Sequence, residues 1–228
     1  MSATAMGHAV VTGASSGIGA AIVTRLLREG WRVTGLSRSD PARSEPGFMH
    51  LPVDLLDDDA LVRTVTGVDA NALVHAAGLT RVGPLGSLDP AAGHLLWRLH
   101  VDVAIRLADI LVPRMPDGGR IVLIGSRASA GVPGRSQYGA SKAALVPMAR
   151  AWAQELLHRR ITVNVVAPGT TDTPMLRDPA RSANPPKVPP MGRYIRPAEV
   201  AALTAFLLGP EADAITGQQI MICGGSSL

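Results

Sequence analysis

The chain is poor in cysteine, in aromatic residues and in long apolar runs, and each shortage excludes a class of protein. Its single cysteine, Cys223, cannot form an internal disulfide and fits a reducing cytosol. Turn residues interrupt the apolar residues before any run reaches the ~18 residues of a membrane span. The first apolar run, at His8–Thr12, begins too near Met1 for a signal peptide. We therefore expect a soluble, cytoplasmic protein.

The charge balance is basic, with a net charge of +4 at pH 7, but the arginines are scattered along the chain. Scattered arginines favour a solvated surface over a nucleic-acid site. Aromatic residues make up only 3%, whereas proteins that bind single strands need aromatic stacking platforms. We expect no nucleic-acid partner. We also expect no metal, since no metal-ligand spacing is found among His8, His50, His94 and His158.

Short apolar runs alternate with longer helical patterns, which is typical of a parallel sheet with helices on both faces. The length suits one large domain and leaves no room for a separate substrate domain. We predict one α/β domain over residues 1–228, with a Rossmann-like, doubly wound parallel sheet of about seven strands. The predicted strands are His8–Thr12, Arg32–Leu36, Phe48–Val53, Ala72–His75, Arg120–Gly125, Thr162–Val166 and Gln218–Ile222. The predicted helices are Gly17–Glu29, Asp58–Thr66, Pro90–Met115, Ser136–Arg159 and Pro197–Leu208.

The stretch from Thr170 to Arg196 fits neither a helix nor a strand, because six prolines interrupt it. Two interpretations stay open, a lid over a substrate pocket and an irregular surface loop. A lid at this place would select the substrate, so the sequence does not name the substrate.

Directly after the first predicted strand, residues 12–19 read Thr-Gly-Ala-Ser-Ser-Gly-Ile-Gly. Glycines at 13, 17 and 19 let the backbone turn tightly and approach a pyrophosphate. The phosphates then meet the free N–H groups and the positive dipole at the N-terminus of the next helix. This position in an alternating βα chain favours dinucleotide binding over a structural turn.

A second motif, Tyr-x-x-x-Lys, places Tyr138 and Lys142 four residues apart on a predicted helix. With two tyrosines and two lysines in the chain, chance supplies this spacing roughly 0.02 times. Positions i and i+4 share one helix face, so the Lys142 ammonium can lie beside the Tyr138 hydroxyl. A cation there lowers the tyrosine pKa from about 10 and so makes Tyr138 a usable acid and base.

With these motifs the chain resembles the short-chain dehydrogenase/reductase family, whose nucleotide loop has the pattern Thr-Gly-x-x-x-Gly-x-Gly. The resemblance spans the whole chain and ends in Gly224-Gly225. It implies an oxidoreductase that moves a hydride between a nicotinamide and a carbonyl or secondary alcohol, with Tyr138 as general acid and base and Lys142 beside the cofactor ribose. The cofactor-binding residues that it implies are Gly13, Ser15, Ser16, Gly17, Ile18, Gly19, Ser37, Arg38, Asp54, Leu55, Ala76, Ala77, Gly78, Tyr138, Lys142, Pro168, Gly169, Thr171 and Thr173.

The resemblance also implies two further catalytic residues, Ser126 and His100. Ser126 follows a predicted strand where the family places its carbonyl-positioning serine, and Ser129 or an ordinary loop serine is the alternative. His100 stands where relatives carry a catalytic asparagine that holds a local distortion of its helix. Either the imidazole takes over part of the proton path, or it is a helix-surface histidine without a role.

The end of the second predicted strand indicates which cofactor binds. NAD-binding relatives usually carry an acidic residue there, whereas this chain has Ser37 followed by Arg38. A guanidinium without a neighbouring carboxylate suits a 2′-phosphate, so NADP(H) is favoured over NAD.

The family resemblance leaves substrate and assembly partly open. Within the oxidoreductase interpretation, a 3-oxoacyl-thioester reductase that uses acyl carrier protein is the named alternative, because the basic surface suits an acidic carrier. A cofactor-binding regulator with reduced catalysis is the alternative from another class, since His75 and Ala76 replace the asparagines of the usual Asn-Asn-Ala-Gly motif. The helices at Pro90–Met115 and around Tyr138 match those that relatives use for assembly, which implies a homo-oligomer, a two-fold-symmetric tetramer.

Overall fold

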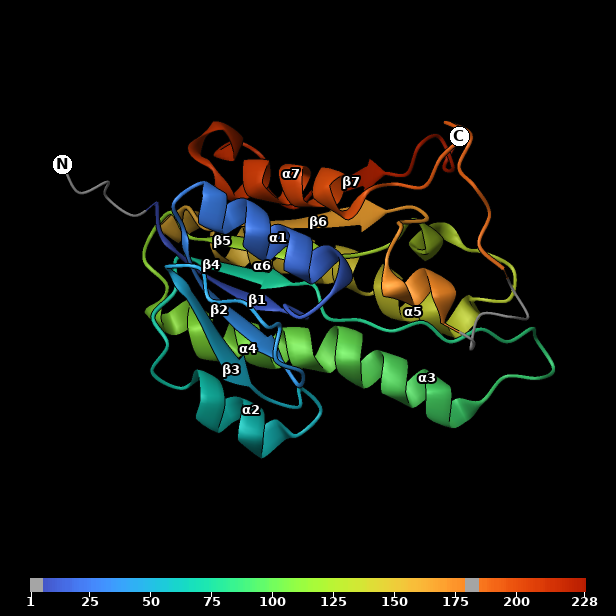
Figure 1. Cartoon of the computed structure of the whole chain (residues 1–228), viewed down its shortest axis with the longest axis horizontal. Helices are drawn as coiled ribbons and strands as arrows, with labels where there is room; N and C mark the ends of the chain where they lie inside the picture. Colours follow the sequence, from blue (N-terminus) through green and yellow to red (C-terminus); the bar gives the residue numbers. More distant parts are fainter. Residues whose placement is uncertain (1–5, 179–184) are drawn as a thin grey trace.

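Seven parallel strands form one sheet in the order β3-β2-β1-β4-β5-β6-β7 (Figure 1). The computed structural model describes residues 6–178 and 185–228. The predicted doubly wound parallel sheet is confirmed. The strands are β1 His8–Thr12, β2 Arg32–Ser37, β3 Phe48–Pro52, β4 Ala72–His75, β5 Arg120–Ile124, β6 Thr162–Pro168 and β7 Gln219–Ile222.

The direction of strand connection reverses between β1 and β4, the two central neighbours. In register, Val11 of β1 pairs with Gly35 of β2 on one side and with Val74 of β4 on the other. From β1 the chain continues outward to β2 and β3 on one side of the sheet, and from β4 it continues to β5, β6 and β7 on the other side. The loops that leave the carboxyl ends of β1 and β4 therefore run in opposite directions and open a crevice between them. Ligands of open α/β sheets bind at such a crevice.

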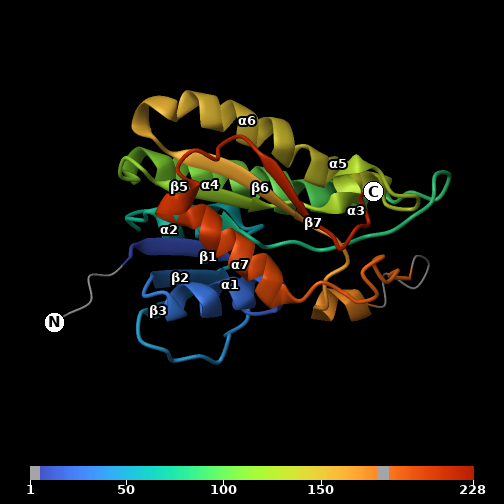
Figure 2. The ribbon, with the colours of Figure 1, turned by 90° about the horizontal axis from the view of Figure 1, so that it is seen from above.

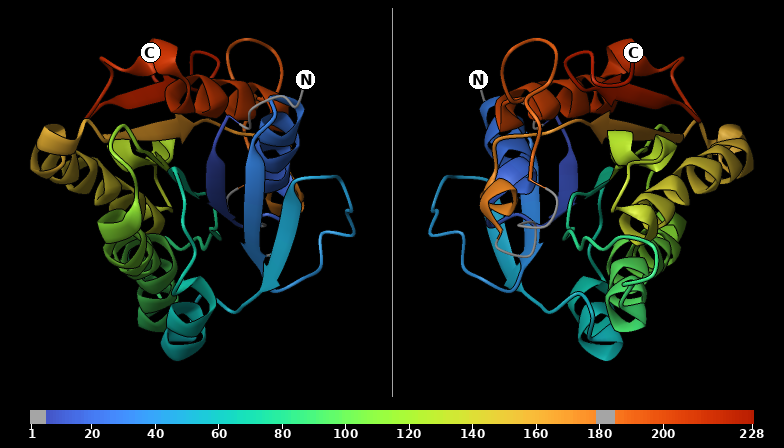
Figure 3. Two further views of the ribbon diagram at one scale, coloured as in Figure 1. Left: turned by 90° about the vertical axis from the view of Figure 1, so that its left-hand side faces the viewer. Right: turned by 90° about the vertical axis from the view of Figure 1, so that its right-hand side faces the viewer.

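Two helix layers cover the sheet (Figures 2 and 3). Helices α1 Gly17–Arg28 and α7 Pro197–Leu208 pack together on one face, where Ile22 and Val200 join one apolar core. Helices α2 Asp58–Val65, α4 Val103–Leu111 and α6 Leu145–Glu155 cover the other face, where Leu107 and Leu145 join a second core. The strands are apolar on both sides because both faces are covered.

The predicted helix over Pro90–Met115 is interrupted in the structure. It divides into α3 Pro90–Trp97, a π-helical turn at Arg98–Asp102, α4, and a 3-10 turn at Val112–Arg114. The π turn contains His100, so the helix distortion that the family resemblance implies is present at this residue.

The predicted helix over Ser136–Arg159 also divides, into α5 Ser136–Ala143, α6 and a 3-10 turn at Leu157–Arg159. The break at Ala144 lies one turn before Pro147, which has no N–H to donate to the carbonyl of Ala143. Ala144 keeps right-handed helical dihedrals, with φ −55 and ψ −30, so α5 and α6 follow one another with little interruption. Helix α5 lies at the carboxyl ends of the strands, beside α3 (Figure 1).

The proline-rich stretch from Thr170 to Arg196 contains one short 3-10 turn, Pro174–Arg177, in its described part. Thr171 forms a β-bridge with Ile195, so the two ends of the stretch meet beside the carboxyl end of β6. Residues 179–184 of the predicted lid lie outside the described residues. No helix in the described ranges is long and apolar enough to cross a membrane.

Candidate active site

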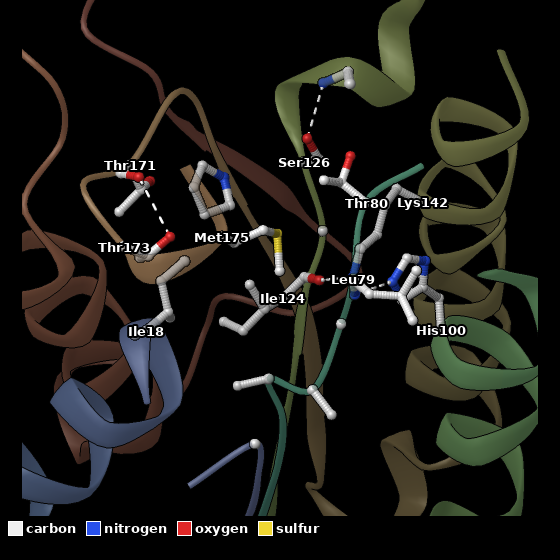
Figure 4. A pocket seen from close by; sticks show the side chains of 18 of the residues that line it. Ile18, Leu79, Thr80, His100, Ile124, Ser126, Lys142, Thr171, Thr173 and Met175 are labelled. Carbon is white, nitrogen blue, oxygen red and sulfur yellow. Dashed lines mark hydrogen bonds between the residues drawn. The ribbon is translucent and has the colours of Figure 1, made fainter. Parts of the chain in front are cut away.

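One cavity lies at the carboxyl ends of the strands and brings together most of the predicted site (Figure 4). The glycine loop and α1 form one wall, and the ends of β4, β5 and β6 with α5 form the others. The predicted residues that line it are Gly13, Ser16, Gly17, Ile18, Gly19, Ala76, Ala77, Gly78, His100, Ser126, Tyr138, Lys142, Pro168, Gly169, Thr171 and Thr173.

The glycine loop has room for a pyrophosphate only because side chains are missing. Gly13 has φ +67, and a Cβ there would lie 3.0 Å from the Cα of Ala77. A Cβ on Gly19 would lie 2.1 Å from the carbonyl oxygen of Gly13. Ser16 precedes α1 without capping it through its side chain, which leaves N–H groups of the first turn to bind phosphate oxygens. The loop therefore fits the pyrophosphate of a dinucleotide.

Lys142 is buried on α5, and its Nζ donates a hydrogen bond of 2.8 Å to the main-chain carbonyl of Ile124. Burial lowers the pKa of this lysine from 10.5 to about 7, because the charged form loses hydration. An ideal Cβ on Gly78 would lie 3.5 Å from the same Nζ. Lys142 is thus held between the end of β5 and the loop after β4.

Ser126 caps the 3-10 turn Arg127–Ala130 at the end of β5. Its Oγ accepts a hydrogen bond of 3.1 Å from the N–H of Ala128. Because that bond uses a lone pair, the hydroxyl proton is left to donate toward the cavity that Ser126 and Tyr138 both line. The serine is therefore oriented as a hydrogen-bond donor.

His100 is fully buried and uses both ring nitrogens. Its Nε2 accepts from the N–H of Leu79 at 3.2 Å, and its Nδ1 lies 2.9 Å from the Oγ of Ser141. Since Ser141 donates its hydroxyl proton to the carbonyl of Tyr138, Nδ1 carries the imidazole proton. Burial and the nearby charge of Lys142 hold the pKa of His100 well below its usual value. The alternative of a helix-surface histidine is wrong.

His75 is a second buried histidine, and it binds the π turn from the end of β4. Its Nε2 lies 3.1 Å from the carbonyl oxygen of Leu99, and its Nδ1 lies 3.0 Å from the hydroxyl of Thr12. Thr12 also accepts from the N–H groups of Ala76 and Ala77. Burial lowers the pKa of His75 to about 3, so the ring is neutral. The histidine that replaces an asparagine therefore joins β1, β4 and the distorted helix.

Five predicted cofactor residues lie outside this cavity: Ser15, Ser37, Arg38, Asp54 and Leu55. The Ser37 hydroxyl donates to the carbonyl of Ser39 and contacts His50 Nε2 at 3.0 Å, so the protein already uses it. Arg38 is exposed, Asp54 accepts from the N–H of Leu56, and Leu55 belongs to the core.

Beside the glycine loop lies a second hollow, lined by Ala14 and Ser15 and by residues 41–46. Arg43 lines it and is largely covered, with its guanidinium 5.3 Å from the Phe48 ring and hydrogen bonds to Thr24 and Glu45. The sequence interpretation missed Arg43, because only the fold places the segment 41–46 beside Ser15, which lies far from it in the sequence. A basic residue shortly after the second strand was the available signal.

Among the lining residues that the sequence interpretation missed are three with polar or charged side chains near the catalytic groups: Thr80, Arg127 and Arg135. Arg127 directly follows Ser126, and Arg135 comes three residues before Tyr138. Their closeness to the two catalytic motifs was the available signal. Among the described residues, no group of three His, Cys, Asp or Glu side chains could hold a metal ion.

Comparison with known proteins identifies the family. The family model described as Enoyl-(Acyl carrier protein) reductase matches residues 13–227. The cyclic-di-GMP-binding biofilm dispersal mediator protein of Escherichia coli (strain K12) is 35% identical over 94% of this chain and 94% of its own. The 3-oxoacyl-(acyl-carrier-protein) reductase MabA of Mycobacterium bovis is 34% identical over 96% of this chain and 92% of its own.

A solved structure resembles this one closely as well. It is a blue fluorescent protein from a metagenomic library in complex with NADPH, with a TM-score of 0.86 and 31% identity over 98% of this chain and 99% of that chain. The chain belongs to the short-chain dehydrogenase/reductase family. It is an oxidoreductase of this family, which binds a nicotinamide cofactor and acts on CH–OH and C=O groups of small molecules.

Proposed function

We propose that the protein is an NADP(H)-dependent carbonyl reductase and alcohol dehydrogenase, with Tyr138 as proton donor and acceptor. One observation carries this proposal: Ser126, Tyr138 and Lys142 line the same cavity as the glycine loop. The loop fits a dinucleotide, and the other three residues supply a hydrogen-bond donor, a transferable proton and a cation. The bound nicotinamide supplies or accepts the hydride.

In reduction, the Ser126 hydroxyl donates a hydrogen bond to the substrate oxygen and stabilises the charge that develops there. The Tyr138 hydroxyl then gives its proton to that oxygen. Protonated Lys142 makes this transfer possible near neutral pH, because a cation ~5 Å from the phenol stabilises the phenolate by about 3 kcal/mol at an effective dielectric near 20. In oxidation the same proton returns to Tyr138.

Three observations support NADP(H) over NAD. Arg38 is exposed beyond the end of β2, and within the described residues it forms no ion pair, so it is available to a 2′-phosphate. Arg43, which is paired with Glu45, lines the hollow beside the glycine loop as a second guanidinium. The metagenomic relative was solved with NADPH, which supports the same cofactor.

The substrate within this class is a small or acyl-type carbonyl compound, selected by the stretch from Thr170 to Arg196 acting as a lid. A 3-oxoacyl thioester of acyl carrier protein is the named alternative, supported by the name of the mycobacterial relative. A regulator with reduced catalysis is the less favoured alternative, because Ser126, Tyr138 and Lys142 are all in place. The name of the Escherichia coli relative, which refers to cyclic-di-GMP binding, supports this regulatory alternative.

Oxidation of NADPH in the presence of a broad ketone panel, with a 3-oxoacyl thioester included, tests this proposal. We expect carbonyl-dependent NADPH oxidation that is faster than NADH oxidation at equal concentrations. Tight NADPH binding without turnover of any carbonyl would contradict the enzyme and support the regulator.

A further inference from the structure

Two arginines line the active-site cavity beside its catalytic residues. Arg127 directly follows Ser126, and Arg135 precedes α5, three residues before Tyr138. No aspartate or glutamate occurs among the described residues that line this cavity. Arg127 and Arg135 therefore bring positive charge to the reacting end of the cavity.

The environment of Arg127 differs from that of other partly covered arginines in this protein. Arg120 is paired with Asp213, and Arg159 with Asp117. Arg127 is only partly exposed, yet its guanidinium has no hydrogen bond or ion pair within residues 6–178 and 185–228. Partial burial removes hydration from a guanidinium, and a bound anion would return the lost interactions. The cavity is thus prepared for an anionic group.

Thr80 adds a neutral hydrogen-bond donor to the same cavity (Figure 4). It lies on the segment after β4, two residues from Gly78, and is 3% exposed. Within the described part of the chain, its hydroxyl forms no hydrogen bond. The lining of the cavity also includes the apolar side chains of Leu79 and Met175.

We propose that the substrate carries an anionic oxygen group, a carboxylate or a phosphate, close to its reacting carbon. Arg127 and Arg135 bind this group, and Thr80 donates to it. The planar fork of a guanidinium matches two oxygens of either group. The proposal rests on the proposed reductase function and narrows it, because the carbons beside the reacting carbonyl of a 3-oxoacyl thioester carry no charge.

Binding of unreactive probes tests the proposal independently of turnover. The protein is saturated with NADP⁺, so that the cofactor and not the probe occupies the glycine loop. Butyrate, butyl phosphate and the neutral isostere butyramide are then titrated by calorimetry. We expect at least one anion to bind about 10-fold or more tightly than butyramide, since a charge-assisted hydrogen bond contributes on that scale. The tighter of the two anions identifies the group.

Substitution of the arginines locates the binding site. In Arg127→Met and Arg135→Met, we expect the preference for the anion to fall about 10- to 100-fold, and Arg→Lys at either position to keep part of it. Arg63→Met, on the exposed surface of α2, is the matched control and should keep the preference. NADP⁺ affinity and Tm of each variant report whether it is folded.

The anion site would be overturned if the three probes bind with equal affinity or if neither anion binds. It would also be overturned if folded Arg127→Met and Arg135→Met keep the wild-type preference for the anion. Failure of the proposed function gives a different result, namely no carbonyl-dependent NADPH oxidation. An active enzyme that reduces a keto acid and its methyl ester equally well, with no preference for anionic probes, would keep the reductase and reject the anion site.

Discussion

The Nδ1 atom of His100 lies 2.9 Å from the Oγ of Ser141, which donates its own proton to the main-chain carbonyl of Tyr138. The other ring nitrogen accepts from the N–H of Leu79. The imidazole therefore connects the loop after β4 with the first turns of α5. We infer that His100 is a positioning residue for Tyr138, because the hydrogen bonds leave neither nitrogen free to carry a proton across the site.

Substitution of His100 separates positioning from proton transfer. Asparagine can still donate and accept, so we expect His100→Asn to keep kcat within about 10-fold of wild type, and His100→Leu to lose more because it leaves two polar partners unsatisfied. Since the pKa of His100 is well below 6.5, the acidic limb of the kcat/KM profile should be the same in wild type and His100→Asn. A shifted acidic limb at equal cofactor affinity would instead place the imidazole in the proton path.

His75 should make the fold sensitive to acid. Its folded pKa is about 3 against 6.5 for the ordinary side chain, so below pH 6.5 the unfolded chain binds a proton that the folded protein does not. This difference costs the folded state about 1.4 kcal/mol per pH unit between those two values. Thermal unfolding from pH 7 to pH 4.5 should show a shallower loss of Tm in His75→Asn than in wild type.

The exposed His94 on α3 provides the matched control for that experiment. His94→Asn should follow the wild-type dependence of Tm on pH. Parallel curves for wild type and His75→Asn would mean that His75 is not the group that acid must protonate.

Arg38 should determine cofactor preference. Arg38→Asp replaces a phosphate partner with a carboxylate that suits ribose hydroxyls, so we expect NADPH to lose about 10- to 100-fold in kcat/KM relative to NADH. Arg63→Asp, which changes the same charge on α2, should leave the ratio unchanged. An unaltered ratio in Arg38→Asp would assign the 2′-phosphate to another residue, and Arg43 would be tested next.

We expect the chain to assemble through the exposed face of the interrupted helix. Trp97 at the end of α3 is 45% exposed and Ile105 on α4 is 41% exposed, and both would be covered in an oligomer built on this face. We expect light scattering at micromolar concentration to give a multiple of 23.7 kDa, four-fold for the proposed tetramer. Ile105→Lys should shift the mass toward the monomer. A wild-type mass of 23.7 kDa would contradict the oligomer.

The sequence predicted the sheet well because the strands are short, separate apolar runs, several of them bounded by glycine. All seven strands lie within a residue or two of their predicted bounds. The sequence predicted the catalytic and cofactor motifs equally well, since each is a short local pattern at a strand end or on one helix face. These motifs are the glycine loop, Ser126, Tyr138 and Lys142.

The missed features depend on contacts between distant segments. Only the family resemblance implied the distortion at His100, because hydrophobic periodicity does not distinguish a π turn from an ordinary helix. The hydrogen bond between His75 and the Leu99 carbonyl of this turn joins residues far apart in the chain. Arg127 and Arg135 lie beside the catalytic motifs in the sequence, but only the fold shows that both line the cavity. The interruption between α5 and α6 could have been predicted from the sequence, because Pro147 lacks the N–H of a regular helix.

The most direct test of the proposed mechanism is the kcat of Tyr138→Phe with NADPH and the best ketone of the panel. Phenylalanine keeps the ring and removes only the transferable proton, so kcat should fall at least about 100-fold while NADPH affinity stays within a few-fold of wild type. Tyr194→Phe, at the only other tyrosine and outside the cavity lining, should keep the wild-type kcat. A Tyr138→Phe enzyme that retains more than a tenth of the wild-type kcat would contradict Tyr138 as the proton donor.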